Sequence, residues 1–219
     1  MQKQEHAVRF NLSGVSIDAD VSIPADATGT VLFVHGSGSS RHSSRNQFVA
    51  GSLRSQGLGT VLMDLLTPAE EHADQFSGRL RFDIRFLARR VFAIVDEMRR
   101  QMTAPLGLFG ASTGAAAALV AAAARAESIL AVVSRGGRPD LAREALADVR
   151  APTLLIVGSE DHDVVELNRK AMTRMKTEAR IEIVPGASHL FHEPGALETV
   201  ARLAAEWFTS HLAMRGDTA

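Results

Sequence analysis

Hydrophobic and polar residues alternate along the first part of the chain and then give way to continuous hydrophobic runs. Residues 8–12 and 15–23 show the alternation, with Ser13 and Gly14 between them, which predicts a β-hairpin closed by a tight turn. Residues 30–34 are hydrophobic or β-branched throughout, as in a strand that is buried on both faces. The pattern therefore leads from a half-exposed hairpin into a fully buried sheet.

Segments with helical periodicity alternate with short apolar runs over the rest of the chain. Residues 80–102 are the clearest helix, because hydrophobic residues recur there at steps of three and four and form one apolar face. The other predicted helices are 45–55, 113–126, 164–177 and 196–211, and the other predicted strands are 59–64, 106–109, 129–134, 153–157 and 181–184. This alternation predicts an α/β fold with a mostly parallel central sheet, an N-terminal antiparallel hairpin at its edge and helices on both faces.

The length fits one domain. A chain of 219 residues can enclose one proper core but is short for two, so we expect a single domain over 1–219 with no separate cap domain. Residues 65–78 form the longest stretch for which the pattern predicts no element, and the sequence leaves open whether this segment covers part of a site. With 46% hydrophobic and 22% charged residues and a net charge of −1, nothing in the composition indicates a nucleic-acid or membrane-surface partner.

The chain contains no cysteine, which excludes disulfides, thiol nucleophiles and thiolate metal sites. Residues 1–6 lack the apolar segment of a secretory signal. The longest apolar run, 115–124, is shorter than the roughly 18 residues that a membrane span needs. We therefore expect a cytoplasmic protein.

A candidate nucleophile lies between a predicted strand and an alanine-rich predicted helix. The joining residues, Gly110 to Gly114, read Gly-Ala-Ser-Thr-Gly, so that Ser112 stands on a tight turn at the positive end of the helix that follows. A side chain two positions before or after the serine would collide with the neighbouring strand or helix, which is why both places need glycine. The turn alone is a common sequence, and its strand–turn–helix setting gives it weight.

A serine needs a base to take its proton, and an acid usually orients that base. Asp161 is the predicted acid, because it follows the strand predicted at 153–157 and precedes the histidine candidates along the chain. Glu160 and Asp163 are alternative acids in the same loop. A purely structural alternative is that Asp161 or Asp163 only caps the helix that begins near Val164.

The predicted base is His189, on the loop between the last predicted strand and the last predicted helix. From that position an imidazole can reach over the serine, and His192 is the alternative. The acyl intermediate also needs an oxyanion hole. We expect one donor to be the backbone N–H of Thr113 and the other to be the N–H of Ser37, with Gly38 as the second choice.

These motifs together resemble the α/β-hydrolase superfamily, and within it the small branch similar to dienelactone hydrolases. The resemblance runs from His35 to the final helix, and its most specific parts are the turn at 110–114, the acid loop at 158–161 and the residues 186–189. It implies hydrolysis of a small-molecule ester or lactone without a cofactor or a metal ion. Dienelactone hydrolases proper use a cysteine nucleophile, whereas this chain has a serine, which favours a general carboxylesterase.

Other functions remain as alternatives to this interpretation. A thioesterase, peptidase or acyltransferase would use the same residues, and a catalytically silent binding protein would keep the fold. A dinucleotide site is disfavoured, because Arg41 stands where the glycine pattern that begins at Gly36 needs a third small residue. A metal site at 161–163 is disfavoured, because adjacent residues rarely point at one ion.

Several arginines fall on or just after loops at the carboxyl end of the predicted sheet. They are Arg41, Arg45, Arg79, Arg81, Arg135 and Arg138. One hypothesis is that the substrate carries a carboxylate or another anion that one or two of them bind, with Arg41 as the first candidate. The alternative is that these arginines are simply solvated surface. The oligomeric state is not predicted by any feature of the sequence.

Overall fold

The computed structural model describes residues 6–12 and 14–213. The strands are β1 (His6–Leu12), β2 (Val15–Ser22), β3 (Thr30–Val34), β4 (Gly59–Met63), β5 (Leu106–Ala111), β6 (Ala131–Arg135), β7 (Thr153–Gly158) and β8 (Ala179–Val184). The helices are α1 (Ser44–Ser55), α2 (Pro68–Ser77), α3 (Ile84–Gln101), α4 (Thr113–Ala124), α5 (His162–Met172) and α6 (Ala196–Leu212), with 3₁₀ segments η1 (Leu80–Phe82) and η2 (Pro139–Asp148).

All these strands join in one sheet in the order β1-β2-β4-β3-β5-β6-β7-β8. The hairpin β1–β2 is antiparallel and pairs antiparallel to β4, and every pair from β4 to β8 is parallel. The predicted α/β fold with its N-terminal antiparallel hairpin is confirmed. Ser13, half of the predicted hairpin turn, and the predicted signal-free residues 1–5 lie outside the described residues.

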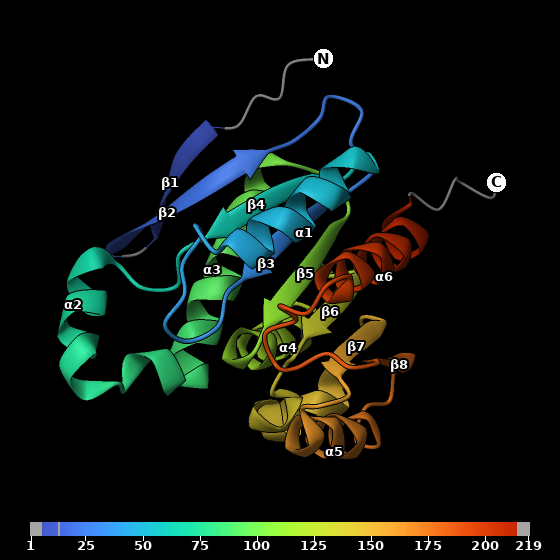
Figure 1. The fold of residues 1–219 in the computed structure, drawn as a ribbon. Coiled ribbons are helices and arrows are strands. Elements are labelled where there is room, and N and C mark those ends of the chain that lie inside the picture. The colour runs from blue at the N-terminus through green and yellow to red at the C-terminus, as the bar shows by residue number, and fades with distance from the viewer. Residues whose placement is uncertain (1–5, 13, 214–219) are drawn as a thin grey trace.

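Helices cover both faces of the sheet. Figure 1 shows α1 and α6 side by side on one face and α3 and α4 on the other. Each face has its own hydrophobic cluster, with Val49 and Phe208 in the first and Val91 and Leu119 in the second. Because the helices follow parallel strands, the loops that carry the candidate site residues gather at the carboxyl edge of the sheet.

Four segments differ clearly from the predicted elements, and one of them is the helix predicted at 164–177, which ends at Met172. Residues 65–78, for which the pattern predicts no element, contain α2, whose N-terminus is closed by a capping box between Thr67 and Glu70. The helix predicted at 80–102 begins only at Ile84, since Asp83 accepts the N–H of Phe86 and ends the preceding 3₁₀ turn. The segment η2 has no predicted counterpart.

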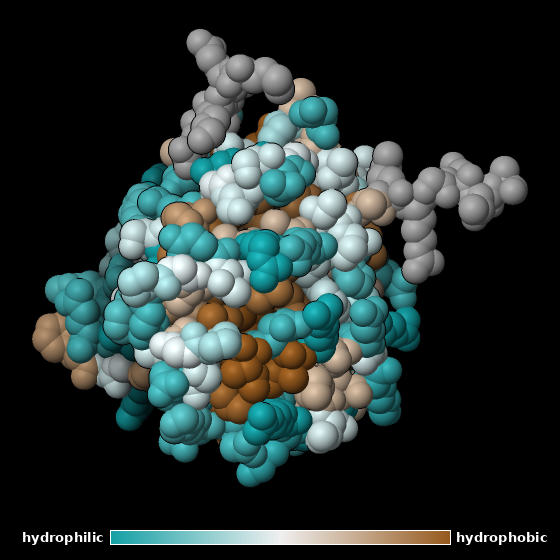
Figure 2. Space-filling view, turned by 45° about the vertical axis from the view of Figure 1, so that its right-hand side comes forward, coloured by the Kyte–Doolittle hydropathy of each residue, from teal (hydrophilic) through white to brown (hydrophobic). Residues whose placement is uncertain are grey.

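The surface is mainly polar on the face that Figure 2 shows. Hydrophilic residues cover most of it, and hydrophobic residues gather in a small area near the middle. Among the described residues, no helix is long and apolar enough to cross a membrane.

Candidate active site

Ser112 occupies a strained turn between β5 and α4. Its backbone has φ 50° and ψ −123°, a conformation that side chains rarely adopt. Three hydrogen bonds hold the turn. The Ser112 N–H donates to the carbonyl of Arg135 at 3.2 Å, and the Ser112 carbonyl accepts the N–H groups of Ala115 and Arg138, each at 3.1 Å. The serine is therefore fixed both to the neighbouring strand β6 and to its own helix.

The two glycines of the turn are required by close backbone contacts. A Cβ atom on Gly110 would lie 2.4 Å from Cα of Ala115, and one on Gly114 would lie 2.2 Å from the carbonyl oxygen of His35. Such distances are far below van der Waals contact. The steric reason that the sequence gives for both glycines is present in the structure.

Asp161 and His189 form a pair across two loops. His189 Nδ1 lies 2.6 Å from Asp161 Oδ2, so the ring donates a hydrogen bond to the carboxylate when Nδ1 is protonated. Asp161 stands at the N-cap of α5, but its side chain makes no capping hydrogen bond. Its carboxylate is therefore directed to the histidine and not to the helix.

The alternative acid and base residues have other surroundings. Glu160 accepts a hydrogen bond from Ser159 Oγ at 2.9 Å, and Asp163 is exposed in the first turn of α5. His192 contacts Ser188 Oγ at 3.4 Å. This arrangement favours Asp161 and His189 over the alternatives.

The serine turn and the histidine loop meet at the end of β6. Gly136 follows Arg135, which accepts the Ser112 N–H, and a Cβ on Gly136 would lie 3.0 Å from the carbonyl oxygen of His189. The structure describes both Ser112 and His189 and has no hydrogen bond between their side chains. Such a bond is often long in a free enzyme and shortens when substrate binds.

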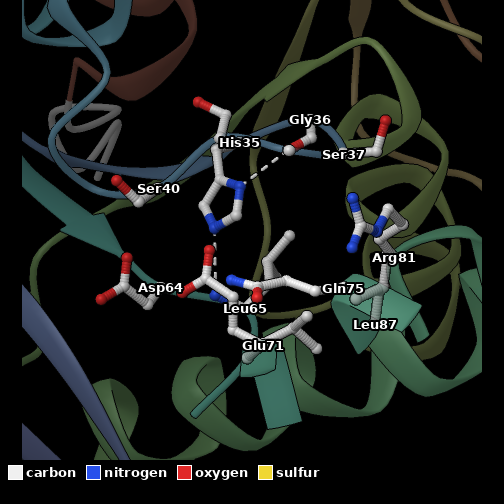
Figure 3. Close-up of a pocket in the computed structure, with 13 residues that line it drawn as sticks. His35, Gly36, Ser37, Ser40, Asp64, Leu65, Glu71, Gln75, Arg81 and Leu87 are labelled. Carbon is white, nitrogen blue, oxygen red and sulfur yellow. Dashed lines mark hydrogen bonds between the residues drawn. The ribbon is translucent and has the colours of Figure 1, made fainter. Parts of the chain in front are cut away.

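His35 anchors the loop that follows β3. Its Nε2 accepts the N–H of Leu65 at 3.1 Å, which leaves the proton on Nδ1 to bond with the carbonyl of Gly36 at 2.9 Å (Figure 3). Burial lowers the pKa of His35 and keeps the ring neutral. A Cβ on Gly36 would lie 3.0 Å from Cβ of Ser112, so this loop runs directly beside the nucleophile.

Ser37 and Thr113, the two residues predicted to supply the oxyanion hole, are joined by a hydrogen bond that the sequence does not indicate. The N–H of Ser37 donates to Oγ1 of Thr113 at 2.9 Å. The Thr113 side chain therefore links the loop after β3 to the first residue of α4. To bind an oxyanion, the Ser37 N–H must share this bond or leave it.

A cavity of about 210 Å³ opens beside this loop (Figure 3). It is lined by residues of the loop after β3, the end of β4, α2 and the following segments: His35, Gly36, Ser37, Gly38, Ser39, Ser40, Asp64, Leu65, Leu66, Glu71, Gln75, Arg81 and Leu87. Glu71 and Gln75 belong to α2, so the segment 65–78 borders the cavity, whose lining does not include Ser112 or His189.

Asp74 fixes α2 to the segment that follows it. It is fully buried and accepts hydrogen bonds from the Leu80 N–H at 2.7 Å and from Arg81 Nε at 2.6 Å. Burial acts to raise the pKa of Asp74, but these hydrogen bonds outweigh it and lower the pKa to about 2. The ionised Asp74 carboxylate therefore holds α2, which forms one wall of the cavity, against residues 80 and 81.

The arginines at this edge fall into two groups. Arg41, the first candidate for an anion, is paired with Asp64 and lies 3.5 Å from Asp20, so its charge is already compensated. Arg81 is paired with Asp74, and Arg138 with Asp140. Among the described residues, no carboxylate lies within 4 Å of Arg45, Arg79 or Arg135. Arg79 is exposed, whereas Arg135 is buried.

The chain is similar to proteins of the dienelactone hydrolase family in sequence and in fold. A family model described as the dienelactone hydrolase family matches residues 70–212. The crystal structure of a dienelactone hydrolase from Anabaena variabilis is 52% identical, with a TM-score of 0.95 over 97% of this chain and 100% of that one. Est1E from Butyrivibrio proteoclasticus shares the fold at 16% identity, with a TM-score of 0.79 over 94% of this chain and 99% of that one.

Two curated relatives come from strains of Mycobacterium tuberculosis and carry the name "Putative phosphoribosyl transferase". They are 49% identical over 218 residues, which is 98% of this chain and 48% of each relative. The chain thus spans about half the length of the curated relatives it matches.

Proposed function

Because the chain belongs to the dienelactone hydrolase family, we propose that it cleaves carboxylic esters or lactones through an acyl-enzyme on Ser112. The observation that carries the proposal is the 2.6 Å contact between His189 and Asp161, in a loop that reaches the serine turn at Gly136. A nucleophile on a strained turn, a base and an orienting acid are the parts that acyl transfer needs.

The first half of the proposed reaction forms the acyl-enzyme. His189 Nε2 takes the proton of Ser112 as its oxygen attacks the ester carbonyl, and the carbonyl electrons move to the oxygen. The N–H groups of Thr113 and Ser37 stabilise that oxyanion. Collapse of the intermediate breaks the ester bond, and His189 gives its proton to the departing alcohol.

The second half releases the acid. His189 removes a proton from water, which attacks the acyl carbonyl, and it then returns the proton to the Ser112 oxygen. Asp161 holds the ring with Nδ1 protonated and stabilises its positive form throughout. Every catalytic group in these proposed steps is a side chain or a backbone N–H of the chain, so the proposed reaction uses no cofactor or metal ion.

The proposed substrate is a small molecule, and the cavity of about 210 Å³ beside Ser37 is its proposed binding space. A thioesterase or an acyltransferase would use the same groups with a different leaving group or acceptor. The transferase name belongs to relatives of about twice this length, and we propose hydrolysis for the part of the sequence that this chain shares with them.

The lack of cysteine supports the proposed cytoplasmic location.

A matched set of acyl substrates tests the proposal. The purified protein should release 4-nitrophenol from 4-nitrophenyl acetate, and Ser112→Ala should lose at least about a thousandfold in kcat/KM. Ser188→Ala, in the histidine loop but outside the proposed chemistry, is the control variant. A silent binding protein would show no turnover above buffer in any of the three, and the same acyl group on a thiol tests the thioesterase alternative.

A further inference from the structure

Arg135 is a buried cation without a partner among residues 6–12 and 14–213. It ends strand β6 and is 7% exposed, and its Nε and Nη1 make no hydrogen bond with any described residue. Water or a counter-charge normally satisfies a guanidinium, and a buried charge without either is costly. The other buried arginine of the described chain, Arg90, is paired with Glu70. The surroundings of Arg135 therefore favour a bound anion, which no carboxylate of the described part of the chain supplies.

A second arginine lies at the same place. Strand residues Ala131 and Val133 pack into the cluster that contains Val49 of α1, so Arg135, two residues further on, points to the face of the sheet that α1 and α6 cover. Arg45 lies one turn before Val49, at the helix N-terminus, which the β–α connection places at the carboxyl edge of the sheet. Its buried Nε also lacks a partner among the described residues. Burial and the charge of Arg45 lower the pKa of Arg135 to about 10, so Arg135 stays positive at neutral pH.

We propose that Arg135 and Arg45, with the first turn of α1, form a binding site for a small oxyanion, a phosphate or carboxylate group. Oxygen atoms of such a group can accept hydrogen bonds from several guanidinium N–H groups at once. The N-terminal end of a helix adds a positive dipole and free N–H groups. One bound anion would compensate two cations that otherwise repel each other in a buried place.

The site adjoins the proposed catalytic machinery but differs from the cavity beside Ser37. The carbonyl of Arg135 accepts the Ser112 N–H, and Gly136 lies against His189. The cavity lining includes neither Arg135 nor Arg45. An anion here is therefore either a free ion next to the histidine loop or the charged end of an ester bound at Ser112.

Thermal unfolding in inorganic phosphate tests the site itself. Phosphate and chloride buffers of equal ionic strength are compared for the wild type, Arg135→Met, Arg45→Met and Arg150→Met. Arg150 is an exposed arginine paired with Glu127 and serves as the control. At about ten times its dissociation constant, phosphate should raise the Tm of the wild type and Arg150→Met by roughly 3–6 °C more than that of the other two.

The comparison with Arg135→Met removes the general stabilising effect of phosphate on folded proteins. Without phosphate, Arg135→Met should be at least as stable as the wild type, because the substitution removes an uncompensated buried charge. Equal phosphate shifts in all four proteins would overturn the proposal. If Arg135→Met does not fold, Arg45→Met, at a half-buried position, decides by the same comparison.

A second arm identifies the source of the anion and rests on the proposed hydrolysis. A 4-nitrophenyl ester with a carboxylate at the end of its acyl chain is compared with its neutral analogue. If the ester supplies the anion, phosphate raises KM for the charged ester alone, and Arg135→Met abolishes the preference for it. If a free ion fills the site, both KM values are unchanged by phosphate. The phosphate-dependent Tm shift in Ser112→Ala keeps the binding test independent of catalysis.

Discussion

Replacing Gly114 with alanine adds a single methyl group, but it should lower both the stability of the protein and its rate of hydrolysis. The added Cβ would lie 2.2 Å from the carbonyl oxygen of His35 and 2.3 Å from that of Val34. Both are backbone atoms of the strand and loop that position Ser37, so no flexible side chain can move aside. Relief of the clash requires α4 and this loop to separate by roughly 1 Å, because carbon and oxygen atoms without a bond need more than 3 Å.

The expected cost has two parts. Overpacking against a fixed backbone costs about 2–3 kcal/mol, which lowers the Tm of a chain of this length by roughly 4–12 °C. A displacement of about 1 Å between nucleophile and oxyanion donor can reduce the rate about a hundredfold. Gly51→Ala is the matched control, since its Cβ in α1 would lie 3.8 Å from Arg54 Nη2 and meet no backbone. It should stabilise the protein by about 0.5–1 kcal/mol.

Thermal unfolding and hydrolysis of 4-nitrophenyl acetate measure the two parts separately. The account predicts a lower Tm and a large loss of kcat for Gly114→Ala, with a slightly higher Tm and normal kcat for Gly51→Ala. If both variants gain stability and keep activity, the close packing of the turn against the loop after β3 is not what the site depends on.

Three further perturbations address other parts of the account. Asp161→Asn should reduce kcat by about 10²–10⁴ with little change in KM, whereas Asp163→Asn should keep full rate, and equal rates in both would remove Asp161 from the mechanism. Thr113→Val leaves the N–H of Ser37 without its acceptor and should cost about 1–3 kcal/mol of stability in urea unfolding, while Thr113→Ser should retain most of it. Burial lowers the pKa of His35, so below about pH 6.5 the unfolded chain binds a proton that the folded ring does not. The free energy of unfolding therefore falls as the pH is lowered, by at most about 1.4 kcal/mol per pH unit. Urea unfolding at pH 7 and 5.5 should show a smaller loss in His35→Gln, and an unchanged loss would contradict a buried neutral ring.

The fold could be predicted because local patterns and topology agree. Alternating and continuous apolar runs mark the hairpin and the buried strands, and strand–helix alternation leaves few sheet topologies. Helix α2 escapes this reasoning, since its ten residues have one buried side chain, Asp74, and no apolar stripe. The signal that could have found it is the capping box at Thr67 and Glu70, with Pro68 at the first helical position.

In the candidate site, too, some features can be predicted from the sequence and others cannot. Ser112, Asp161 and His189 each follow the carboxyl end of a strand, and because these strands are parallel, their loops lie at one edge of the sheet. Which arginine has a free charge is a different question, because the partners of Arg41 come from the ends of separate strands. Arg135 has no hydrogen-bond partner among the described residues, a property that depends on the side chains packed around it in three dimensions and that sequence spacing cannot predict.

The central claim is that Ser112 is a nucleophile activated by His189. Labelling with a fluorophosphonate probe, followed by mass spectrometry of the digested protein, tests it most directly, because the probe bonds covalently only to an activated serine. We expect one phosphonate adduct, on the peptide that contains Ser112, formed rapidly in the wild type and abolished in His189→Ala. An unmodified Ser112, or equal labelling in His189→Ala, would contradict it.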